Sequence, residues 1–440
     1  MTRAVVLGGG FAGVLAATVL ARHVDEVVVV ERDRYPAAPA PRRGLPQSHH
    51  SHVLVTGGAR ALETLLPGTL DELYAHGAHR RGLPGDSLIL TGDGWFHRFD
   101  CAAYFVSCSR GLFDHVVRRR AAARVVEGVQ VLGLTGDARR VTGVRVSPGE
   151  TIAADLVVDA TGRRSQAPRW LEAIGGPPVE EVTVSTGLAY ATRICAAPPG
   201  LADVPAIMLH PGAGLDRGAT LLPLEGGRWV VTLTGTQGSA PPLDEAGFQA
   251  FARSLRDPVV AELLALTTPL GPIRPFRDTA NRRRLLERAP LPAGFVALGD
   301  AVVAVNPLYS HGLSIAALSA LRLDHELRAG IGPGLQAALA AEAEPSWRMA
   351  VERDRYVNGE AAGPPPSAHA LKVRARLARA RLGSAELGAE LFHAQALIPA
   401  PPPDRLARFK ALAGDPAPLL TADQARRQYP LLCPDAASLP

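Results

Sequence analysis

The first residues of the chain alternate between apolar runs and a glycine-rich turn. An apolar run over residues 3–7 leads into a turn with glycines at positions 8, 10 and 13. Apolar positions over 14–20 then recur with helical spacing, and a second apolar run over 27–31 ends in a glutamate. This order predicts a strand, a tight turn, a helix and a parallel strand, as in a Rossmann-like nucleotide-binding unit.

The turn residues explain why a dinucleotide suits this unit. Gly8 permits the tight turn, Gly10 lets the backbone approach a pyrophosphate, and Gly13 lets the helix pack on the strand. The N-terminus of the helix supplies free N–H groups and a positive potential. Glu31 is placed to accept both hydroxyls of an unphosphorylated adenosine ribose, which favours FAD or NAD over NADP.

The remaining pattern predicts a sheet followed by helices. Alternating apolar and polar positions between about 182 and 234 indicate a separate antiparallel sheet, the expected wall of a substrate site. Beyond 331 the pattern is helical, with interruptions at 363–366 and 399–403 that are rich in proline. The other expected elements are helices over about 51–66 and 110–123, strands over 88–90 and 95–99, and a hairpin over 129–146.

Composition and charge narrow the class of protein. The chain has 47 Lys and Arg against 42 Asp and Glu, and its basic clusters at 118–120 and 282–284 lack interleaved aromatic residues. We therefore expect no nucleic-acid partner. No apolar run is long enough to cross a membrane, and the N-terminus lacks the features of a signal peptide. These features predict a cytoplasmic protein without integral membrane association.

Cysteine and histidine spacing argues against a metal centre. The four cysteines have neither CxxC spacing nor the density of a disulfide framework, which suits a reducing compartment. His50 and His52 are two residues apart, a poor spacing for one helix face, and no carboxylate lies near them in sequence. We expect these histidines to cap or pack beside a cofactor, and we expect no metal site.

Two later segments resemble motifs of FAD-dependent aromatic hydroxylases and their relatives. The first, residues 155–163, is an apolar strand that contains Asp159 and ends in a turn; the second, residues 294–300, ends in Gly299-Asp300 and is followed by a proline-containing segment at 306–312. In that superfamily the aspartate of the second motif binds a ribityl hydroxyl of FAD. The following helix directs its N-terminus at the flavin, where it stabilises negative charge.

The resemblance extends to a bacterial branch of the FAD-dependent monooxygenases, and within it to the epoxidases that act on polyene precursors of polyether ionophores. It covers about residues 3–330. Ser310 departs from it, because relatives usually have glycine there, and the tail after 331 is much less recognisable. The segments that resemble the bacterial branch are 43–47 with His50 and His52, 109–110, 281–283, and 299–300 with 306–307. Those that resemble the epoxidases are 57–60, 65–69, 94–99, 190–193 and 227–229.

The resemblance implies FAD as cofactor and a set of binding residues. Two arginines would neutralise phosphate charge, although a surface salt bridge is the alternative role for Arg43. Tyr309 and His311 are candidates to polarise the substrate or the hydroperoxide, with loop packing as the equal alternative. The expected FAD-binding residues are Gly8, Gly10, Gly13, Glu31, Arg43, Arg110, Asp159, Asp300, Pro307 and Gly312.

The implied fold is α/β: a Rossmann-like FAD-binding domain with an antiparallel β-sheet substrate domain and a helical C-terminal region. We expect the FAD-binding domain over 1–175 and 271–330, the sheet domain over 176–270 and the helical region over 331–440. Residues 80–100 are a candidate addition to the substrate wall.

The implied activity is epoxidation of alkenes in a polyketide-type polyene through a flavin C4a-hydroperoxide, in polyether or related secondary-metabolite biosynthesis. Such a substrate needs an elongated pocket, expected to be lined by 184–193, 205–210 and 219–234. The cofactor supplies the reactivity, so no acid–base constellation is required. Electrons would come from NAD(P)H or a separate flavin reductase, and the substrate would arrive free or carrier-bound.

Two alternatives remain: an FAD-dependent hydroxylase of an aromatic or polyketide substrate, and a non-catalytic flavoprotein that assists a partner enzyme. A flavin halogenase is disfavoured, because such enzymes use a lysine and this chain has none before Lys372. It also lacks the Trp-x-Trp-x-Ile-Pro segment of halogenases and the Pro-x-x-Tyr-x-Trp-x-Phe-Pro segment of flavin-dependent saturases.

Overall fold

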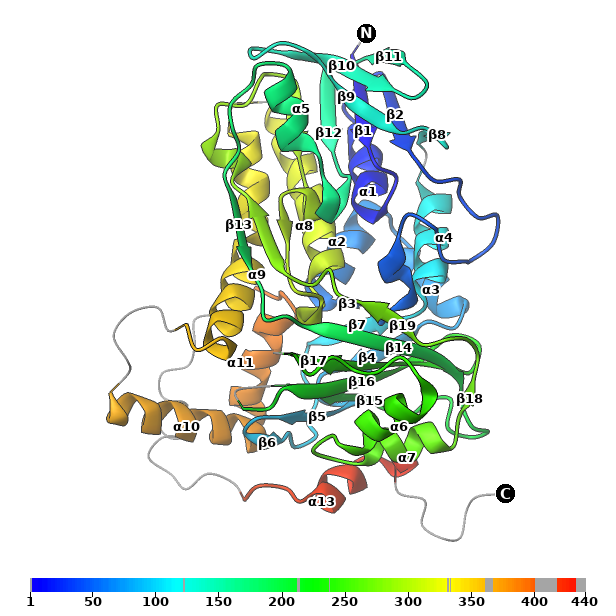
Figure 1. Ribbon diagram of the computed structural model, residues 1–440, viewed down its shortest axis with the longest axis vertical. Coiled ribbons are helices and arrows are strands. Elements are labelled where there is room, and N and C mark those ends of the chain that lie inside the picture. Colours follow the sequence, from blue (N-terminus) through cyan, green and yellow to red (C-terminus); the bar gives the residue numbers. More distant parts are fainter. Residues whose placement is uncertain are drawn as a thin grey trace.

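The computed structural model contains a lobe built on a parallel sheet and a lobe built on a larger sheet, with C-terminal helices along one side (Figure 1). This arrangement confirms the predicted fold class. The structure describes residues 2–121, 123–211, 214–236, 238–330, 332, 334–360, 367–399 and 418–432.

The first sheet has five parallel strands in the order β21-β12-β1-β2-β8. Its central strand is completely buried from Ala4 to Leu7, as expected for a parallel sheet covered on both faces. The strands are β1 (Arg3–Leu7), β2 (Glu26–Glu31), β8 (Arg124–Glu127), β12 (Leu156–Asp159) and β21 (Phe295–Ala297).

Helices cover one face of this sheet, and a small antiparallel sheet lies over the other. Ala4 and Val6 pack in the cluster that contains the helices, whereas Val5 and Leu7 pack with Leu134 and Val141. The helices on the first face are α1 (Phe11–Leu20), α2 (Thr56–Leu65), α4 (Arg110–Arg120) and α8 (Gly312–Ala329). The small sheet consists of β9 (Val131–Gly136), β10 (Val141–Val146) and β11 (Glu150–Ala153), so the hairpin predicted over 129–146 is confirmed.

The second lobe is built on an eight-stranded sheet in the order β18-β14-β17-β16-β15-β5-β6, with β19 paired to β14. Helices α6 (Glu245–Arg253) and α7 (Val259–Ala265) pack on one face through Phe248 and Val260. The strands are β5 (Ser87–Thr91), β6 (Gly94–Trp95), β14 (Ala189–Ala196), β15 (Ala206–Leu209), β16 (Arg217–Leu224), β17 (Arg228–Gly235), β18 (Thr268–Pro269) and β19 (Arg274–Phe276).

Two three-stranded sheets connect the lobes. One pairs β3 (Val53–Val55) and β4 (His79–Gly82) with β7 (Tyr104–Ser107). The other pairs β13 (Glu181–Val184) and β22 (Val303–Ala304) with β20 (Asn281–Arg284). Two further short helices are α3 (Thr69–Ala75) and α5 (Ala167–Ala173).

Two sequence expectations need correction here. The helix expected over 51–66 begins only at Thr56, because the apolar run 53–55, with two β-branched valines, pairs with β7 instead. The strand expected over 95–99 ends at Trp95, since Phe96 leaves the sheet and packs against Phe392, at 4.9 Å between ring centroids.

The tail is helical in its described parts, as predicted. It forms α9 (Leu335–Val357), α10 (Ala368–Gly383), α11 (Ala385–Gln395) and α13 (Ala422–Arg427). Pro399 follows α11, whereas the proline positions at 363–366 and 400–403, and Cys433, lie outside the described residues. Across the described chain, no helix has the length and apolar character to cross a membrane.

Candidate functional site

A cavity of about 470 Å³ extends from the glycine turn of β1–α1 to the face of the large sheet. This volume lies in the range of about 300–1,000 Å³ that is typical of small-molecule sites. Its walls come from segments far apart in sequence: the first βαβ unit, residues 42–53, the start of α4, residues 160–164, and residues 300–316. The cavity therefore depends on the complete fold rather than on one motif.

The glycine turn has the geometry predicted for it. Gly8 adopts a φ of +90°, and a Cβ there would lie 2.9 Å from the Ala160 carbonyl oxygen. A Cβ on Gly13 would lie only 1.8 Å from the Gly8 carbonyl oxygen, so Gly13 permits helix-to-strand packing and does not line the cavity. Gly10 precedes α1 and offers no side-chain cap, which leaves the first amides of α1 available to an anion.

Glu31 lies at the end of β2 and lines the cavity with only 6% exposure. Its carboxylate accepts hydrogen bonds from the backbone N–H of Gly9 at 2.6 Å and of Asp33 at 2.8 Å. The Nη1 atom of Arg42 lies 3.4 Å from the same carboxylate. Glu31 thus organises the turn around it at the adenosine end that the sequence predicts.

Three arginines that line the cavity differ in burial and in hydrogen-bond partners. Arg42 is buried, and its Nε and Nη1 atoms have no hydrogen-bond partner in the described structure. Arg110 is buried and donates from Nε to Asp114 at 2.7 Å. Arg43 is exposed at the rim. The sequence analysis named Arg43 and Arg110 but missed Arg42, because spacing alone does not tell which of two adjacent loop arginines points inward.

The two motif aspartates have different positions. Asp159 is fully buried behind the lining, where its carboxylate accepts from the Thr161 backbone at 2.9 Å and from the hydroxyls of Thr161 and Ser165. Asp300 lines the cavity and accepts no hydrogen bond from any described residue. Burial raises the pKa of Asp300, although the charges of Arg163 and Arg110 oppose the shift. Of the two, only Asp300 presents its carboxylate to the cavity.

The segment before α8 contributes Pro307, Ser310 and Gly312 to the lining. Ser310 has a φ of +58°, the left-handed region that glycine occupies at lower cost, which fits the glycine expected there. Tyr309 and His311 are not part of the lining. The Tyr309 hydroxyl donates to Asp354 at 2.6 Å, and the two ring nitrogens of His311 contact Ser346 and Gln395. These contacts favour the packing interpretation for both residues.

The sheet end of the cavity has aromatic walls that the sequence analysis did not predict as a group. His50 lies 5.2 Å from Phe276 and 6.3 Å from Tyr190, measured between ring centroids. The Tyr190 hydroxyl has no hydrogen-bond partner among the described residues, although the residue is only 6% exposed. Burial raises the pKa of Tyr190 and lowers the pKa of His50 to about 4. Both side chains are therefore neutral at pH 7.

A chain of hydroxyl groups holds His50 in place. The His50 Nδ1 atom lies 2.8 Å from the Thr192 hydroxyl, which lies 2.9 Å from the Thr232 hydroxyl. Ser51 adds its own hydroxyl at 3.1 Å from Thr232. Because Thr192 and Thr232 are opposite each other on β14 and β17, the sheet fixes the orientation of this ring.

Among the described residues, this cavity does not extend along the sheet segments expected to line an elongated pocket. Of the expected segments, only Tyr190 lines the cavity, and no lining residue comes from 205–210, 219–234 or 80–100. The remaining apolar part of this face is filled by Phe392 and Ala396, which pack with Leu222 and Val230. These residues of the C-terminal region cover part of the strands that the sequence predicts as a substrate wall.

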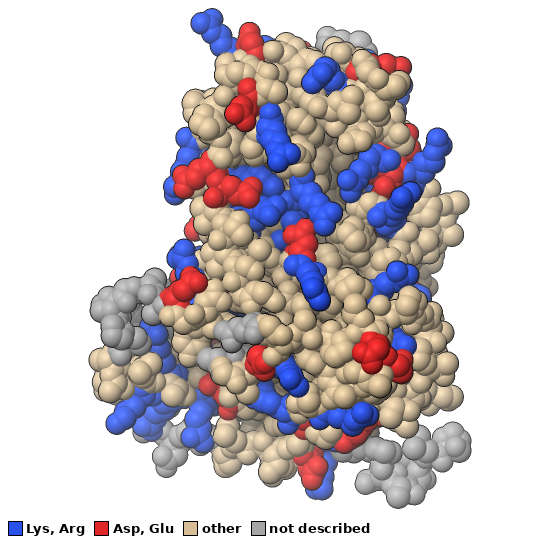
Figure 2. Space-filling model, in the orientation of Figure 1, with Lys and Arg blue, Asp and Glu red and all other residues tan. Residues whose placement is uncertain are grey.

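Polar groups outside the cavity are mostly paired. Figure 2 shows basic and acidic side chains interspersed on the visible face. In the cluster at 282–284, Arg282 and Arg284 lie 3.2 and 3.1 Å from Glu181, and Arg283 pairs with Glu287 and Glu344. The described residues contain no group of acidic, histidine or cysteine side chains that could hold a metal ion.

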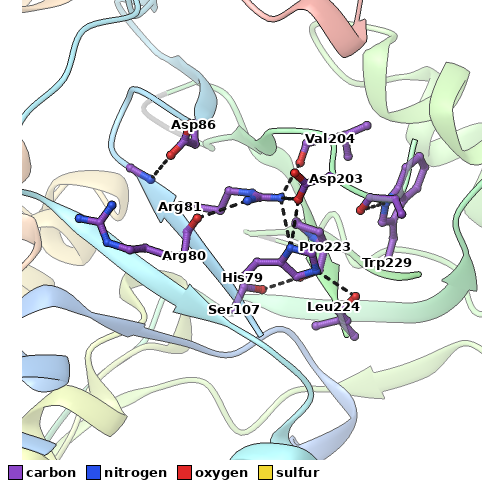
Figure 3. A network of polar contacts seen from close by, with 12 residues as sticks. His79, Arg80, Arg81, Asp86, Ser107, Asp203, Val204, Pro223, Leu224 and Trp229 are labelled. Carbon is purple, nitrogen blue, oxygen red and sulfur yellow. Dashed lines mark hydrogen bonds and ion pairs between the residues drawn. The ribbon is translucent and has the colours of Figure 1, made fainter. Parts of the chain in front are cut away.

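A separate polar network ties β4 to the large sheet (Figure 3). Arg81 forms an ion pair with Asp203, and His79 contacts Asp203 at 3.2 Å and the Leu224 carbonyl oxygen at 3.1 Å. None of these residues lines the cavity. We therefore assign this network a structural role.

The fold and the cavity define the class, an FAD-dependent oxidoreductase, and residues 4–164 match the family model described as FAD dependent oxidoreductase. Protein Rv3254 of Mycobacterium tuberculosis is 32% identical over 393 residues, which cover 82% of each chain. This chain belongs to the same family as Protein Rv3254, and its cofactor is FAD. The cofactor prediction is therefore confirmed.

More distant similarities agree with this class. A tryptophan 2-halogenase of Chondromyces crocatus is 30% identical over 175 residues, 37% of this chain and 30% of that protein. The flavin-dependent brominase Bmp2 has the same fold, with a TM-score of 0.63 and 17% identity over 90% of this chain and 94% of that one. The p-nitrophenol 4-monooxygenase PnpA from Pseudomonas putida gives a TM-score of 0.61 and 18% identity, covering 94% and 99%.

Proposed function

We propose that this chain is an FAD-dependent monooxygenase that epoxidises an alkene of a polyketide-type polyene, as in polyether or related secondary-metabolite biosynthesis. The observation that carries the proposal is the end of the cavity where the rings of His50, Tyr190 and Phe276 meet. An alkene carries no charge, so it needs an apolar surface and no catalytic base. Because His50 and Tyr190 are neutral, this end of the cavity suits such a group.

The residues of the cavity fit FAD. The uncapped N-terminus of α1 and the buried guanidinium of Arg42 are oriented to receive the pyrophosphate, with Arg43 at the rim and Arg110 nearby. Glu31 would contact the adenosine ribose, and the free carboxylate of Asp300 would accept from a ribityl hydroxyl. The unsatisfied Arg42 atoms support this fit, because buried N–H groups without partners are rare in proteins.

When bound, FAD supplies the chemistry of oxygen activation and transfer. The protein's part is to place the alkene and to exclude water. The tilted rings of His50 and Phe276 form a wall of the cavity, and the Tyr190 hydroxyl would donate a hydrogen bond to an oxygen of the substrate. The N-terminus of α8 at Gly312 adds a positive potential at the flavin end.

The test is incubation of the protein with FAD, a reductant, labelled molecular oxygen and a panel of polyene surrogates, followed by mass spectrometry. We expect one labelled oxygen atom in an epoxide and no requirement for halide. Label from water, or no oxygenated product across the panel with either NAD(P)H or a flavin reductase as electron source, would contradict the proposal. The second result would favour a non-catalytic flavoprotein.

Hydroxylation of an aromatic ring is the second candidate, and the three rings of the cavity wall favour it, since aromatic side chains pack well against an aromatic substrate. Ring hydroxylation with alkenes left intact would select it. Halogenation has less support, because Lys372 lies exposed on α10, away from the cavity, and Lys410 lies outside the described residues.

A further inference from the structure

The segment 306–311, which carries part of the cavity lining, is held by the C-terminal helices α9 and α11. Asp354 on α9 is only 2% exposed and accepts hydrogen bonds from three side chains. The Asn281 amide donates at 2.7 Å, the Asn306 amide at 3.1 Å and the Tyr309 hydroxyl at 2.6 Å. No arginine or lysine of the described structure forms an ion pair with this carboxylate, so its charge is compensated by these donors.

The same contacts fix the backbone of the segment. The Asn281 side-chain oxygen accepts from the Asn306 backbone N–H at 2.6 Å, and the Asn306 side-chain oxygen accepts from the Leu308 N–H at 3.0 Å. Asp354 thus fixes both amides in the orientation in which their oxygens face the backbone. The segment needs such support, because it contains Ser310 in the left-handed region.

Further along the segment, His311 is held from two sides. Its Nδ1 atom lies 2.9 Å from the Ser346 hydroxyl on α9, and its Nε2 atom lies 2.8 Å from the Gln395 carbonyl oxygen at the end of α11. Helix α9 also supports the preceding strand β21, since the Gln336 amide bonds both the N–H and the C=O of Ala297. The C-terminal region therefore contacts the second FAD motif at Ala297, Asn306, Tyr309 and His311.

From this geometry we infer that Asp354 is a positioning residue for FAD: it holds residues 306–312 in the shape that places Pro307, Ser310 and the start of α8 against the flavin. The inference rests on the proposed site of FAD in this cavity. It assigns a role in cofactor binding to the part of the chain that least resembles the flavin enzymes.

The test compares three variants. Asp354→Asn keeps the side-chain size but removes the charge and replaces one acceptor oxygen with a donor, so the side chain no longer accepts from both amides and the Tyr309 hydroxyl together. Tyr309→Phe removes a single donor and keeps the ring. Asp324→Asn is the matched control, because Asp324 is 5% exposed on α8 and pairs with His23 and Arg328, away from the cavity.

Two measurements separate positioning from general stability. Hydrogen–deuterium exchange on the FAD-free protein follows the amides of 306–312, and a titration monitored by flavin absorption gives the FAD dissociation constant. We expect faster exchange and a dissociation constant raised about tenfold in Asp354→Asn, smaller changes of the same sign in Tyr309→Phe, and neither change in Asp324→Asn.

Unchanged exchange over 306–312 in Asp354→Asn, or an unchanged FAD dissociation constant, would overturn the inference. Equal effects in Asp324→Asn would do so as well, because they would indicate a general loss of stability. If the proposed epoxidation fails instead, the unaltered protein forms no epoxide while the exchange and titration results stand. Failure of one proposal is therefore distinguishable from failure of the other.

Discussion

The sharpest prediction concerns Arg42, which is buried beside the glycine turn with two guanidinium nitrogens that lack hydrogen-bond partners. Its ionic contacts are long, at 3.4 Å to Glu31 and 3.9 Å to Asp114. Without FAD this arrangement is costly, since a buried N–H without a partner costs about 1–3 kcal/mol. A phosphate oxygen of FAD would satisfy these groups. Arg42 should therefore stabilise the FAD complex more than the FAD-free protein.

The variant Arg42→Met tests this difference, because methionine keeps an unbranched chain of similar length without charge. A charge-assisted hydrogen bond contributes about 1.5–3 kcal/mol, so its loss should raise the FAD dissociation constant by between about 10-fold and 150-fold. The FAD-free protein should change in stability by about 1 kcal/mol or less. Glu31 keeps its two backbone donors and Asp114 keeps Arg110 in that form, while the unsatisfied N–H groups disappear.

The assay combines a flavin titration with urea unfolding of the FAD-free protein. Arg43→Met is the matched control, and its exposed charge is expected to change FAD affinity by less than about fivefold. A large loss of stability in FAD-free Arg42→Met, with FAD affinity unchanged, would refute the reasoning. Arg42 would then be a structural partner of Glu31 and not a ligand for the pyrophosphate.

Three further predictions concern the cavity. Burial raises the pKa of Asp300. The Asp300 side chain therefore contributes to folding stability below the pKa of an unfolded aspartate, and this contribution is lost as the pH rises through the pKa of Asp300 in the folded protein. Asp300→Asn should therefore stabilise the FAD-free protein at pH 7, lose that advantage below about pH 4, and bind FAD more weakly; unfolding and titration at both pH values check this. Ser310→Gly should change the free energy of unfolding by about 1 kcal/mol or less, because relief of the left-handed conformation offsets the added chain entropy; a larger loss would mean that the serine hydroxyl is needed. Tyr190→Phe should retain FAD and stability but turn over substrate more slowly, and unchanged kinetics would remove Tyr190 from the substrate contacts.

Local signals in the sequence were enough to predict the first βαβ unit. Gly8, Gly13 and Glu31 act within one strand–turn–helix–strand segment, so spacing determines their positions. The motif around Asp159 was also found, but its carboxylate binds its own turn through Thr161 and Ser165. A motif locates a turn, whereas the direction of each side chain depends on neighbours that spacing does not reveal.

The substrate end of the cavity lay beyond sequence reasoning for a different reason. His50, Tyr190 and Phe276 come from three segments that meet only in the folded chain, and the pairing of Tyr190 with Phe276 depends on the register between β14 and β19. The same holds for Asp354, whose partners Asn281 and Asn306 are polar residues with no distinctive spacing. Tertiary contacts of this kind leave no periodic pattern in one sequence.

The packing of α11 against the large sheet bears on the space for substrate separately from the glycine turn and Asp300 at the cofactor end. Phe392 fills the apolar face that borders the cavity through Val53, yet it touches none of the residues proposed to hold FAD. A smaller side chain at this position would lengthen the space beside the flavin while the glycine turn and Asp300 stay intact. Two parts of the tail thus bear on different ends of the cavity: Phe392 on α11 limits the space at the substrate end, whereas Asp354 on α9 supports the segment proposed to face the flavin.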